Sequence, residues 1–228
     1  MSQHRMMSAN TPLSFRKSLD VANVSTNNLA ILFLAIGNPS NQFAGTRHNV
    51  GKWAIEKMAT EAWPDFSPFS HDKYLGSVAT SRSDKSAHAH VVLAKTKATF
   101  MNISGPVVAK AWQKFKKENA VNNPCLVVLH DELQVPLGKV QIRRRNTSAR
   151  GHNGLRSIDK TMGNDYTKLA IGINKKSGSN VADYVLAKFN PSEQRILEVD
   201  TMPLLMDIME QMVAGKHVMD KFVGKQGT

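Results

Sequence analysis

The sequence predicts an α/β fold in which helices pack on a mostly parallel β-sheet. Short apolar runs typical of buried strands alternate along the chain with longer segments of helical periodicity. The 228 residues, 41% of them hydrophobic, are enough for one sizeable core. Two strand-like segments joined by a polar loop add an antiparallel hairpin to this arrangement.

Residues 1–28 are treated as a segment apart from the expected domain, which we place at 29–228. The segment is rich in Ser and Asn, and its three basic residues accompany only one acid. Such a composition is typical of an organelle transit peptide, and equally of a disordered polar tail. We therefore expect either a mitochondrial or a cytoplasmic protein.

The first half of the domain has clear patterns for one strand, then a helix, then two further strands. The continuous apolar run 29–37 suggests a strand buried on both faces. A helix is expected over 49–62, where apolar residues recur at helical spacing until Pro64 ends the pattern. Segments 74–80 and 89–95 have the composition of the hairpin strands.

The second half continues the alternation. An amphipathic helix is expected over 102–117, with most of its lysines outside the apolar stripe. Segment 125–130 resembles a buried strand, and the alternation in 139–143 indicates a more exposed one. A helix is expected at 151–162 and a strand at 168–174.

The last forty residues have a helical pattern interrupted by one proline. Pro203 can either begin a second helical segment or kink a single long helix. The sequence pattern fits both arrangements.

The charge of the chain favours a polyanionic partner. Lys plus Arg outnumber Asp plus Glu by 30 to 18, which gives a net charge of +12. The stretch KVQIRRRNTSAR at 139–150 contains no acid and could form a phosphate-binding surface. The alternative is a solvated strand edge that its charge keeps apart from other edges.

Two further features indicate the redox environment of the protein and its relation to membranes. With Cys125 as the single cysteine, no intramolecular disulfide can form, and a reducing compartment is expected. No segment approaches the run of ~18 apolar residues that a membrane helix requires, so we expect no membrane partner.

Polar side chains gather in loops at or near the carboxyl ends of the expected strands, where α/β folds place their functional groups. A neutral imidazole at His48 can take a proton from water, and a carboxylate at Asp131 could hold its other ring N–H. The amides of Asn38, Asn102 and Asn153 could bind peptide groups or stabilise an oxyanion. Each of these residues, taken singly, could instead serve a turn or a helix cap.

Other chemistries have weaker support. These loops contain no good serine or cysteine nucleophile motif, so water activated by His48 is the simpler hypothesis. We expect no metal, because His130 and Asp131 are adjacent in a strand and point to opposite faces, while His152 lacks a partner at ligand spacing. The glycines of the first loop are too widely spaced for a dinucleotide-binding motif.

The chain resembles the bacterial-type peptidyl-tRNA hydrolases over roughly residues 30–220. Four motifs in matching order and spacing carry the resemblance: GNPSNQFAGTRHNVG, TFMNISG, HDELQVPLG and GHNGLRSI. It implies hydrolysis of the ester between a peptide and the terminal ribose of tRNA. It also implies a monomeric three-layer fold, with a twisted mixed sheet between helices and no metal or other cofactor.

The resemblance assigns roles to the polar residues of the motifs. It implies that His48 is the general base and that Asp131 supports its basic form. Asn38 matches the asparagine thought to separate N-blocked from free aminoacyl groups. Asn102 and Asn153 match the amides that bind the peptide and the end of the tRNA.

Four further residues are implied in substrate binding. Phe43 and Phe100 match aromatic residues of one wall, although Phe43 stands where the family commonly has tyrosine. Arg143 matches one phosphate-clamping position, and Lys168 lies near a second that is shifted in this chain. The loop RNTSAR replaces a run that is often rich in glycine.

Two other functions remain open at this point. A non-catalytic RNA-binding protein on the same fold, similar to organelle splicing factors, would not need His48 and Asp131 together. A small-molecule amidohydrolase or esterase would not need the basic surface. Peptidyl-tRNA hydrolysis is therefore the leading hypothesis.

Overall fold

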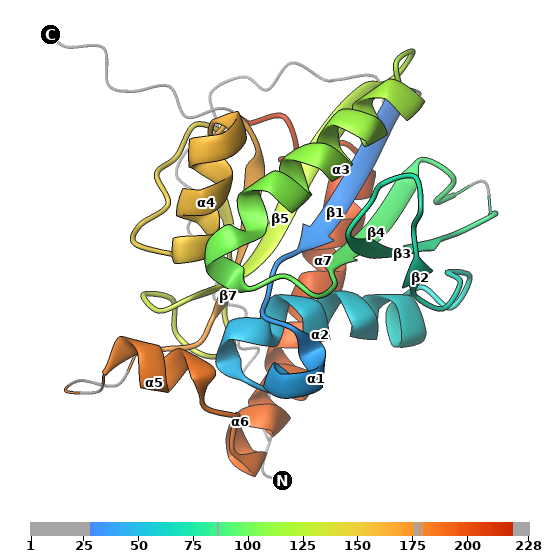
Figure 1. Cartoon of the computed structure of the whole chain (residues 1–228). Coiled ribbons are helices and arrows are strands. Elements are labelled where there is room, and N and C mark those ends of the chain that lie inside the picture. Colours follow the sequence, from blue (N-terminus) through green and yellow to red (C-terminus); the bar gives the residue numbers. More distant parts are fainter. Residues whose placement is uncertain (1–27, 86, 176–177, 179, 221–228) are drawn as a thin grey trace, which may run out of the picture.

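The computed structural model describes residues 28–85, 87–175, 178 and 180–220. Within these residues the strands form one sheet of seven, in the order β2-β3-β4-β1-β5-β7-β6. Helices cover both faces of the sheet (Figure 1). Residues 1–27, where a transit peptide or a polar tail is expected, and the end of the C-terminal helical pattern lie outside the described residues.

The four central strands run parallel. They are β4 (Val91–Thr96), β1 (Leu29–Ala35), β5 (Asn123–Glu132) and β7 (Thr167–Gly172). All seven residues of β1 are buried, because neighbouring strands lie on both sides and helices cover both faces. The continuous apolar run is thus explained, and the prediction of a doubly buried strand is confirmed.

Antiparallel strands complete both edges. The hairpin of β3 (Val78–Arg82) with β4 is confirmed, and β2 (Ser70–His71) extends it. The strand predicted at 74–80 begins later, because Asp72 Oδ1 accepts the backbone N–H groups of Tyr74 and Leu75 at 2.9 and 2.8 Å and closes a turn there. At the other edge the strand expected to be more exposed is confirmed as β6 (Val140–Arg143), and it pairs antiparallel with β7, which the sequence did not predict.

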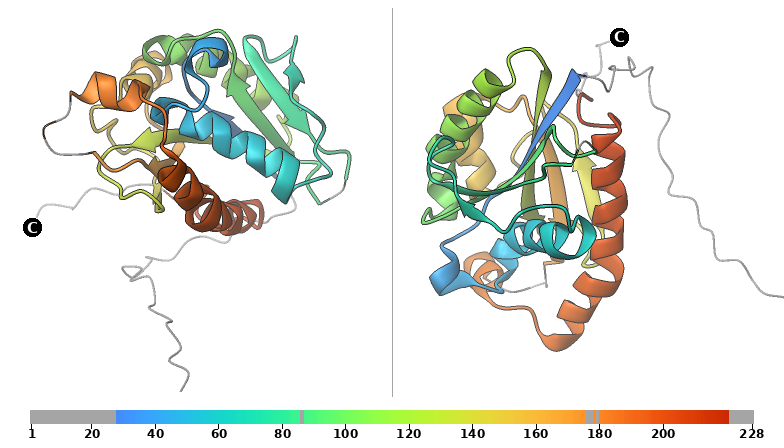
Figure 2. Two further views of the ribbon diagram at one scale, coloured as in Figure 1. Left: turned by 90° about the horizontal axis from the view of Figure 1, so that it is seen from below. Right: turned by 90° about the vertical axis from the view of Figure 1, so that its right-hand side faces the viewer.

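Two pairs of helices form the outer layers. Helices α3 (Ser104–Glu118) and α4 (Asn153–Met162) lie on one face, and α2 (Val50–Lys57) and α7 (Met202–Val213) lie on the other. Figure 2 shows the sheet with α3 and α4 on one side and the long C-terminal helix on the other. The three layers agree with the predicted fold class.

Proline and π-helical turns shape the helices of the second layer. The predicted helix 49–62 is α2 followed by a π-helical turn, Met58–Ala62. The C-terminal segment is one helical run: α6 (Pro191–Ile196), a π-helical turn (Leu197–Thr201) and α7, with Pro203 in the first turn of α7. Since proline has no N–H to donate, the regular hydrogen-bond ladder cannot pass it unchanged.

Two short helices were not predicted, α1 (Ser40–Phe43) and α5 (Val181–Leu186). Both lie at the edge of the sheet where β1 and the other parallel strands end (Figure 1). Among the described helices, none combines the length and the apolar character needed to cross a bilayer. The edge that carries α1 and α5 is where the functional site is found.

Candidate active site

A cleft of about 690 Å³ opens at the carboxyl ends of the parallel strands. Its lining includes all five polar residues that the sequence singled out as possible catalytic or amide-binding groups: Asn38, His48, Asn102, Asp131 and Asn153. Apolar side chains of α5 form part of the wall. The fold therefore brings together residues that lie up to 115 positions apart in the sequence.

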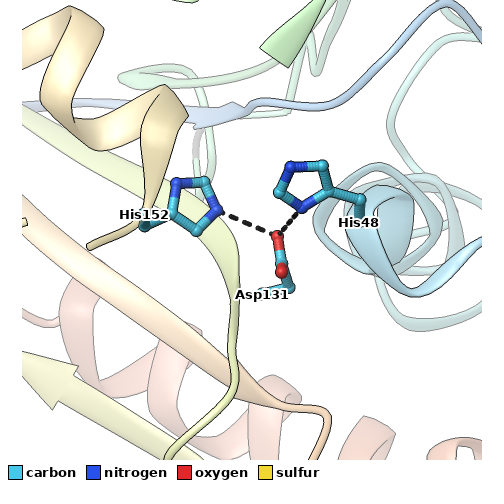
Figure 3. A group of neighbouring side chains, drawn as sticks. All are labelled: His48, Asp131 and His152. Atoms are coloured by element: carbon cyan, nitrogen blue, oxygen red, sulfur yellow. Dashed lines mark hydrogen bonds and ion pairs between the residues drawn. The ribbon is translucent and has the colours of Figure 1, made fainter. Parts of the chain in front are cut away.

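His48 and Asp131 form the hydrogen-bonded centre of the cleft. His48 lies in a 3-10 turn before α2, and its Nδ1 is 2.8 Å from Oδ1 of Asp131 at the end of β5 (Figure 3). Because a carboxylate only accepts, Nδ1 carries the proton and Nε2 is left to accept one. Burial lowers the pKa of His48, but the charge of Asp131 and its hydrogen bond more than offset this and raise the pKa above 6.5.

His152 shares the same carboxylate oxygen, which corrects the prediction that it lacks a partner. Its Nε2 lies 2.9 Å from Oδ1 of Asp131 (Figure 3). Its Nδ1 accepts the backbone N–H of Leu155 at 3.2 Å as the N-cap of α4. This assignment makes His152 a neutral imidazole that donates through Nε2. No local pattern reveals this contact, because Asp131 lies near the end of β5 and His152 caps α4, 21 positions further along the chain.

The state of Asp131 follows from these two neighbours. Burial alone would favour the neutral acid, but His48 and His152 interact with the charged form and hold the pKa of Asp131 well below its usual range. The carboxyl is therefore ionised at neutral pH. An ionised Asp131 stabilises an imidazolium at His48 as it forms.

The three side chains also bring potential metal ligands together. Ligand atoms of His48, Asp131 and His152 lie within 4.8 Å of one another. However, both ring nitrogens contact the same carboxylate oxygen at hydrogen-bond distances of 2.8 and 2.9 Å. A bound zinc ion would need about 2.0–2.2 Å to each ligand and would have to displace these hydrogen bonds. The three side chains are therefore arranged for hydrogen bonds to one carboxylate oxygen rather than for binding a metal ion.

Asn38 is oriented by its own hydrogen bonds. Its Oδ1 accepts the backbone N–H of Met101 at 2.8 Å, and its backbone N–H donates to Oδ1 of Asn49 at 2.8 Å. This bond fixes the orientation of the amide and leaves its Nδ2 N–H groups available to the cleft. Asn38 is thus a donor, suited to a carbonyl oxygen or an oxyanion.

Asn102 and Asn153 line the cleft from two helix starts. Asn102 belongs to the 3-10 turn Met101–Ile103 before α3, and Asn153 is the first residue of α4. The two helices approach closely at Gly105, where an added Cβ would lie 2.1 Å from the carbonyl oxygen of Ser157. The two asparagines thus lie at neighbouring helix starts, and both line the cleft and a groove beside it.

The predicted aromatic pair is formed beside the cleft. The rings of Phe43 and Phe100 meet edge to face, with centroids 6.2 Å apart. Phe100 is half exposed, and neither residue belongs to the lining of the main cleft. The two rings are therefore paired as expected, and Phe43 has no hydroxyl to donate, while the role of the pair in substrate binding stays a prediction.

Arg143 and Lys168 lie away from the cleft surface. They are register partners across β6 and β7, and their exposed fractions are only 4% and 0%. Arg143 pairs with Glu132 at 3.4 Å and donates to the carbonyl oxygen of Ser148. The described structure thus leaves neither cation open to a phosphate, and the clamp role stays a prediction.

Lys168 is the more unusual of the two. Its Nζ lies 4.0 Å from the ring centroid of Tyr166 and finds no hydrogen-bond partner among the described residues. Burial lowers the pKa of Lys168 to about 8. A buried ammonium with no hydrogen bond costs folding free energy.

The acid-free basic stretch is neutralised by acids from other parts of the chain. Arg144 pairs with Asp220 at 3.8 Å, and Arg145 pairs with Asp165 at 2.6 Å. Of the arginines in this stretch, Arg150 is the one that lines the cleft. Ion pairs thus hold several arginines of this stretch, and its phosphate-binding role stays a prediction.

Arg47, which the sequence analysis left without a role, fixes the loop that carries His48. Its guanidinium pairs with Glu193 at 2.6 Å and donates to the carbonyl oxygens of Ala187 and Lys188 at 3.2 and 3.1 Å. These partners are more than 130 positions away, so no local pattern could reveal them. The position of Arg47 next to His48 was the one available signal.

Known proteins resemble this chain over most of its length. A family model described as "Peptidyl-tRNA hydrolase" matches residues 32–227. A peptidyl-tRNA hydrolase of Saccharomyces cerevisiae is 35% identical over 192 residues, covering 81% of this chain and 97% of the relative. One of Wolinella succinogenes is 32% identical over 196 residues, covering 86% and 93%. A crystal structure of peptidyl-tRNA hydrolase from Acinetobacter baumannii matches with a TM-score of 0.61 at 25% identity, covering 84% and 96%.

Proposed function

The chain belongs to the peptidyl-tRNA hydrolase family, and from this premise we propose that its cleft hydrolyses the ester between peptide and tRNA with His48 as general base. The protein is thus an enzyme, a hydrolase of peptidyl-tRNA that returns tRNA to translation. The observation that carries the residue assignment is the contact of 2.8 Å between His48 Nδ1 and Asp131 Oδ1 inside the cleft.

The reaction follows from the protonation states of the site. Nε2 of His48 takes a proton from water as the water oxygen attacks the ester carbonyl carbon. Asp131 stabilises the imidazolium, and Nδ2 of Asn38 donates to the oxyanion of the tetrahedral intermediate. The ester C–O bond then breaks, and the imidazolium returns its proton to the ribose oxygen that leaves.

Substrate binding is assigned to the rim of the same cleft. Asn102 and Asn153 can pair with peptide groups, since each amide offers a donor and an acceptor. Arg150 on the lining and the net charge of +12 favour the phosphates of the acceptor stem. Phe43 and Phe100 offer ring faces and edges next to Asn38.

The proposal is tested by comparing N-blocked with free aminoacyl-tRNA as substrates. The wild-type protein should cleave the N-blocked ester preferentially. His48→Ala should lose ~10²–10⁴-fold or more, as expected for loss of a general base. His71→Ala, an exposed histidine of β2, serves as the matched control and should retain activity. If His48→Ala hydrolysed peptidyl-tRNA at close to the wild-type rate, the assignment of the base would be wrong.

Neither the family match nor the relatives support the RNA-binding alternative. Tight binding of a structured intron RNA by this protein, without any turnover of peptidyl-tRNA, would support that alternative. The basic composition also favours a tRNA ester over a small-molecule ester.

We further propose that the enzyme acts as a monomer in mitochondria. The resemblance to the bacterial-type peptidyl-tRNA hydrolases supports a monomer. The Ser-rich, acid-poor composition of residues 1–28 supports a targeting segment. A fluorescent protein fused after residue 28 should enter mitochondria, and sedimentation should give the mass of one chain. A diffuse cytoplasmic signal or a dimer would contradict these two points.

A further inference from the structure

Lys52 is a buried cation beside the cleft to which the reaction described above gives no role. It lies in α2, one helical turn after His48, and its exposed fraction is 2%. Its Nζ donates to the backbone carbonyl oxygen of Asn38 at 2.7 Å. The hydrogen bond therefore connects the helix that follows the base to the residue that faces the ester.

The backbone of Asn38 is held on both sides. Nδ2 of Asn49 donates to the same carbonyl oxygen at 3.1 Å, and Oδ1 of Asn49 accepts the Asn38 N–H at 2.8 Å. The stem of Lys52 packs on Gly37, where an added Cβ would lie 2.9 Å from Cε of Lys52. Together with the Met101 contact, these bonds engage the backbone N–H, the carbonyl oxygen and Oδ1 of Asn38, so that among the described residues its Nδ2 is the group with no protein partner.

Keeping Lys52 charged in this buried position costs free energy. Burial lowers the pKa of Lys52 to about 8, Lys95 on β4 lowers it as well, and Glu56 on α2 opposes the shift. Lys95 and Glu56 pair with each other, so neither is a dedicated partner of Lys52. Lys52 is still mostly protonated at pH 7, although an apolar side chain of the same length would avoid the desolvation.

We propose that Lys52 is a positioning residue for hydrolysis, which fixes the peptide plane after Asn38 so that Nδ2 of Asn38 faces the ester oxygen. This inference rests on the role given to Asn38 in the proposed function. Loss of the Lys52 donor removes the shorter of two described hydrogen bonds to the Asn38 carbonyl oxygen and leaves the longer one from Asn49, so the peptide plane is held less firmly and Nδ2 can shift away from the oxyanion. A displacement of ~1 Å at a reacting centre can cost ~10²-fold in rate.

The test measures kcat and KM on N-blocked aminoacyl-tRNA for four proteins: wild type, Lys52→Met, Asn38→Ala and the double variant. Lys52→Met should lower kcat by about 10- to 100-fold with little change in KM, because the oxyanion forms only in the transition state. In the Asn38→Ala background the same substitution should cause no further loss. Lys52→Gln retains a shorter N–H donor and should give an intermediate kcat.

A matched control and a stability measurement separate positioning from folding. Lys57→Met removes a more exposed lysine of the same helix, which pairs with Glu61, and should leave kcat unchanged. Thermal melting should show that Lys52→Met is folded, since it removes a desolvated charge. If Lys52→Met kept the wild-type kcat while Asn38→Ala lost activity, the inference alone would fail. Equal losses in both backgrounds would overturn it too, whereas a fully active Asn38→Ala would refute the role of Asn38 itself.

Discussion

Asp131 is shared by two histidines that differ in what their second ring nitrogen does. In His152 that nitrogen caps α4, so this ring stays neutral and donates to the carboxylate. In His48 it faces the cleft and can accept a proton. One carboxylate thus fixes the tautomer of both rings, and only His48 is left in a state that can activate water.

The first prediction concerns the pH dependence of hydrolysis. Activity needs neutral His48, so kcat/KM should fall as the pH drops through the raised pKa of His48, above 6.5. Asp131→Asn removes the charge that raises this pKa and leaves the burial that lowers it. The acidic limb should therefore move to lower pH, while the plateau falls because the ring loses its orienting carboxylate. A limb at unchanged pH in Asp131→Asn would show that another group titrates.

A second prediction concerns the buried Lys168. Its pKa of about 8 in the folded protein is below the ordinary value of 10.5, so the unfolded chain binds more protons between these two values. The free energy of unfolding should therefore rise with pH across this window. Lys168→Met should raise stability at pH 7 by a few kcal/mol at most and reduce that rise, leaving the part that Lys52 contributes, since the pKa of Lys52 is also lowered to about 8.

Urea unfolding at pH 7 and pH 10 measures both effects. Arg145→Met, which removes the surface ion pair with Asp165, is the control and should not change the pH dependence. A less stable Lys168→Met would mean that the ammonium makes a favourable contact. Weaker tRNA binding by a stable Lys168→Met would support the phosphate role expected from the sequence.

Single residues were predictable where a motif placed them at a strand end. Asn38, His48, Asp131, Asn102 and Asn153 were expected in one cleft, and all five line it. Other contacts escaped prediction because their partners are backbone atoms or are distant in sequence. Lys52 looks like an ordinary helical lysine until its bond to a carbonyl oxygen is seen.

At the scale of elements, the close approach of α3 and α4 determines where the two substrate amides lie. Gly105→Ala should push the helices apart, since its Cβ would meet a backbone oxygen at 2.1 Å. We expect a loss of about 1–3 kcal/mol in stability, typical of overpacking, together with a higher KM for peptidyl-tRNA as Asn102 and Asn153 separate. Lys117→Ala, at the exposed end of α3, should change neither. An unchanged KM in a destabilised Gly105→Ala would show that the packing of α3 on α4 does not affect substrate binding.

Elements with several turns or a long apolar run were predictable, and short ones were not. Helices α3 and α4 repeat their apolar positions over two or more turns, so periodicity reveals them. Helices α1 and α5 have four and six residues, too few for a periodic pattern. Strand β2 has two residues and exists only through its pairing with β3.

At the scale of the whole molecule, the sheet order explains how the motifs meet. The four parallel strands end at one edge, so loops after β1, β4, β5 and β7 converge there. The parallel arrangement followed from the alternation of strands and helices. The antiparallel partners at both edges depend on pairings between distant segments, and only the hairpin signal was visible in the sequence.

The net charge of +12 gives a prediction about salt. Raising the salt concentration should weaken binding of peptidyl-tRNA and raise its KM steeply, because each counterion released from the phosphates gains less entropy in a more concentrated salt solution. An N-blocked aminoacyl adenosine, which has the ester and no tRNA body, is the control substrate, and its hydrolysis should change little. Equal salt effects on both substrates would show that the basic surface does not contact the tRNA.

The central claim is that the imidazole of His48 takes the proton from water. Single-turnover hydrolysis of N-blocked aminoacyl-tRNA by His48→Ala, with and without added imidazole, tests it most directly. We predict a loss of ~10²–10⁴-fold, with part of the rate restored by imidazole in its neutral form. A rate close to that of the wild type, or a loss that a folded His48→Ala shows only in KM, would contradict the claim.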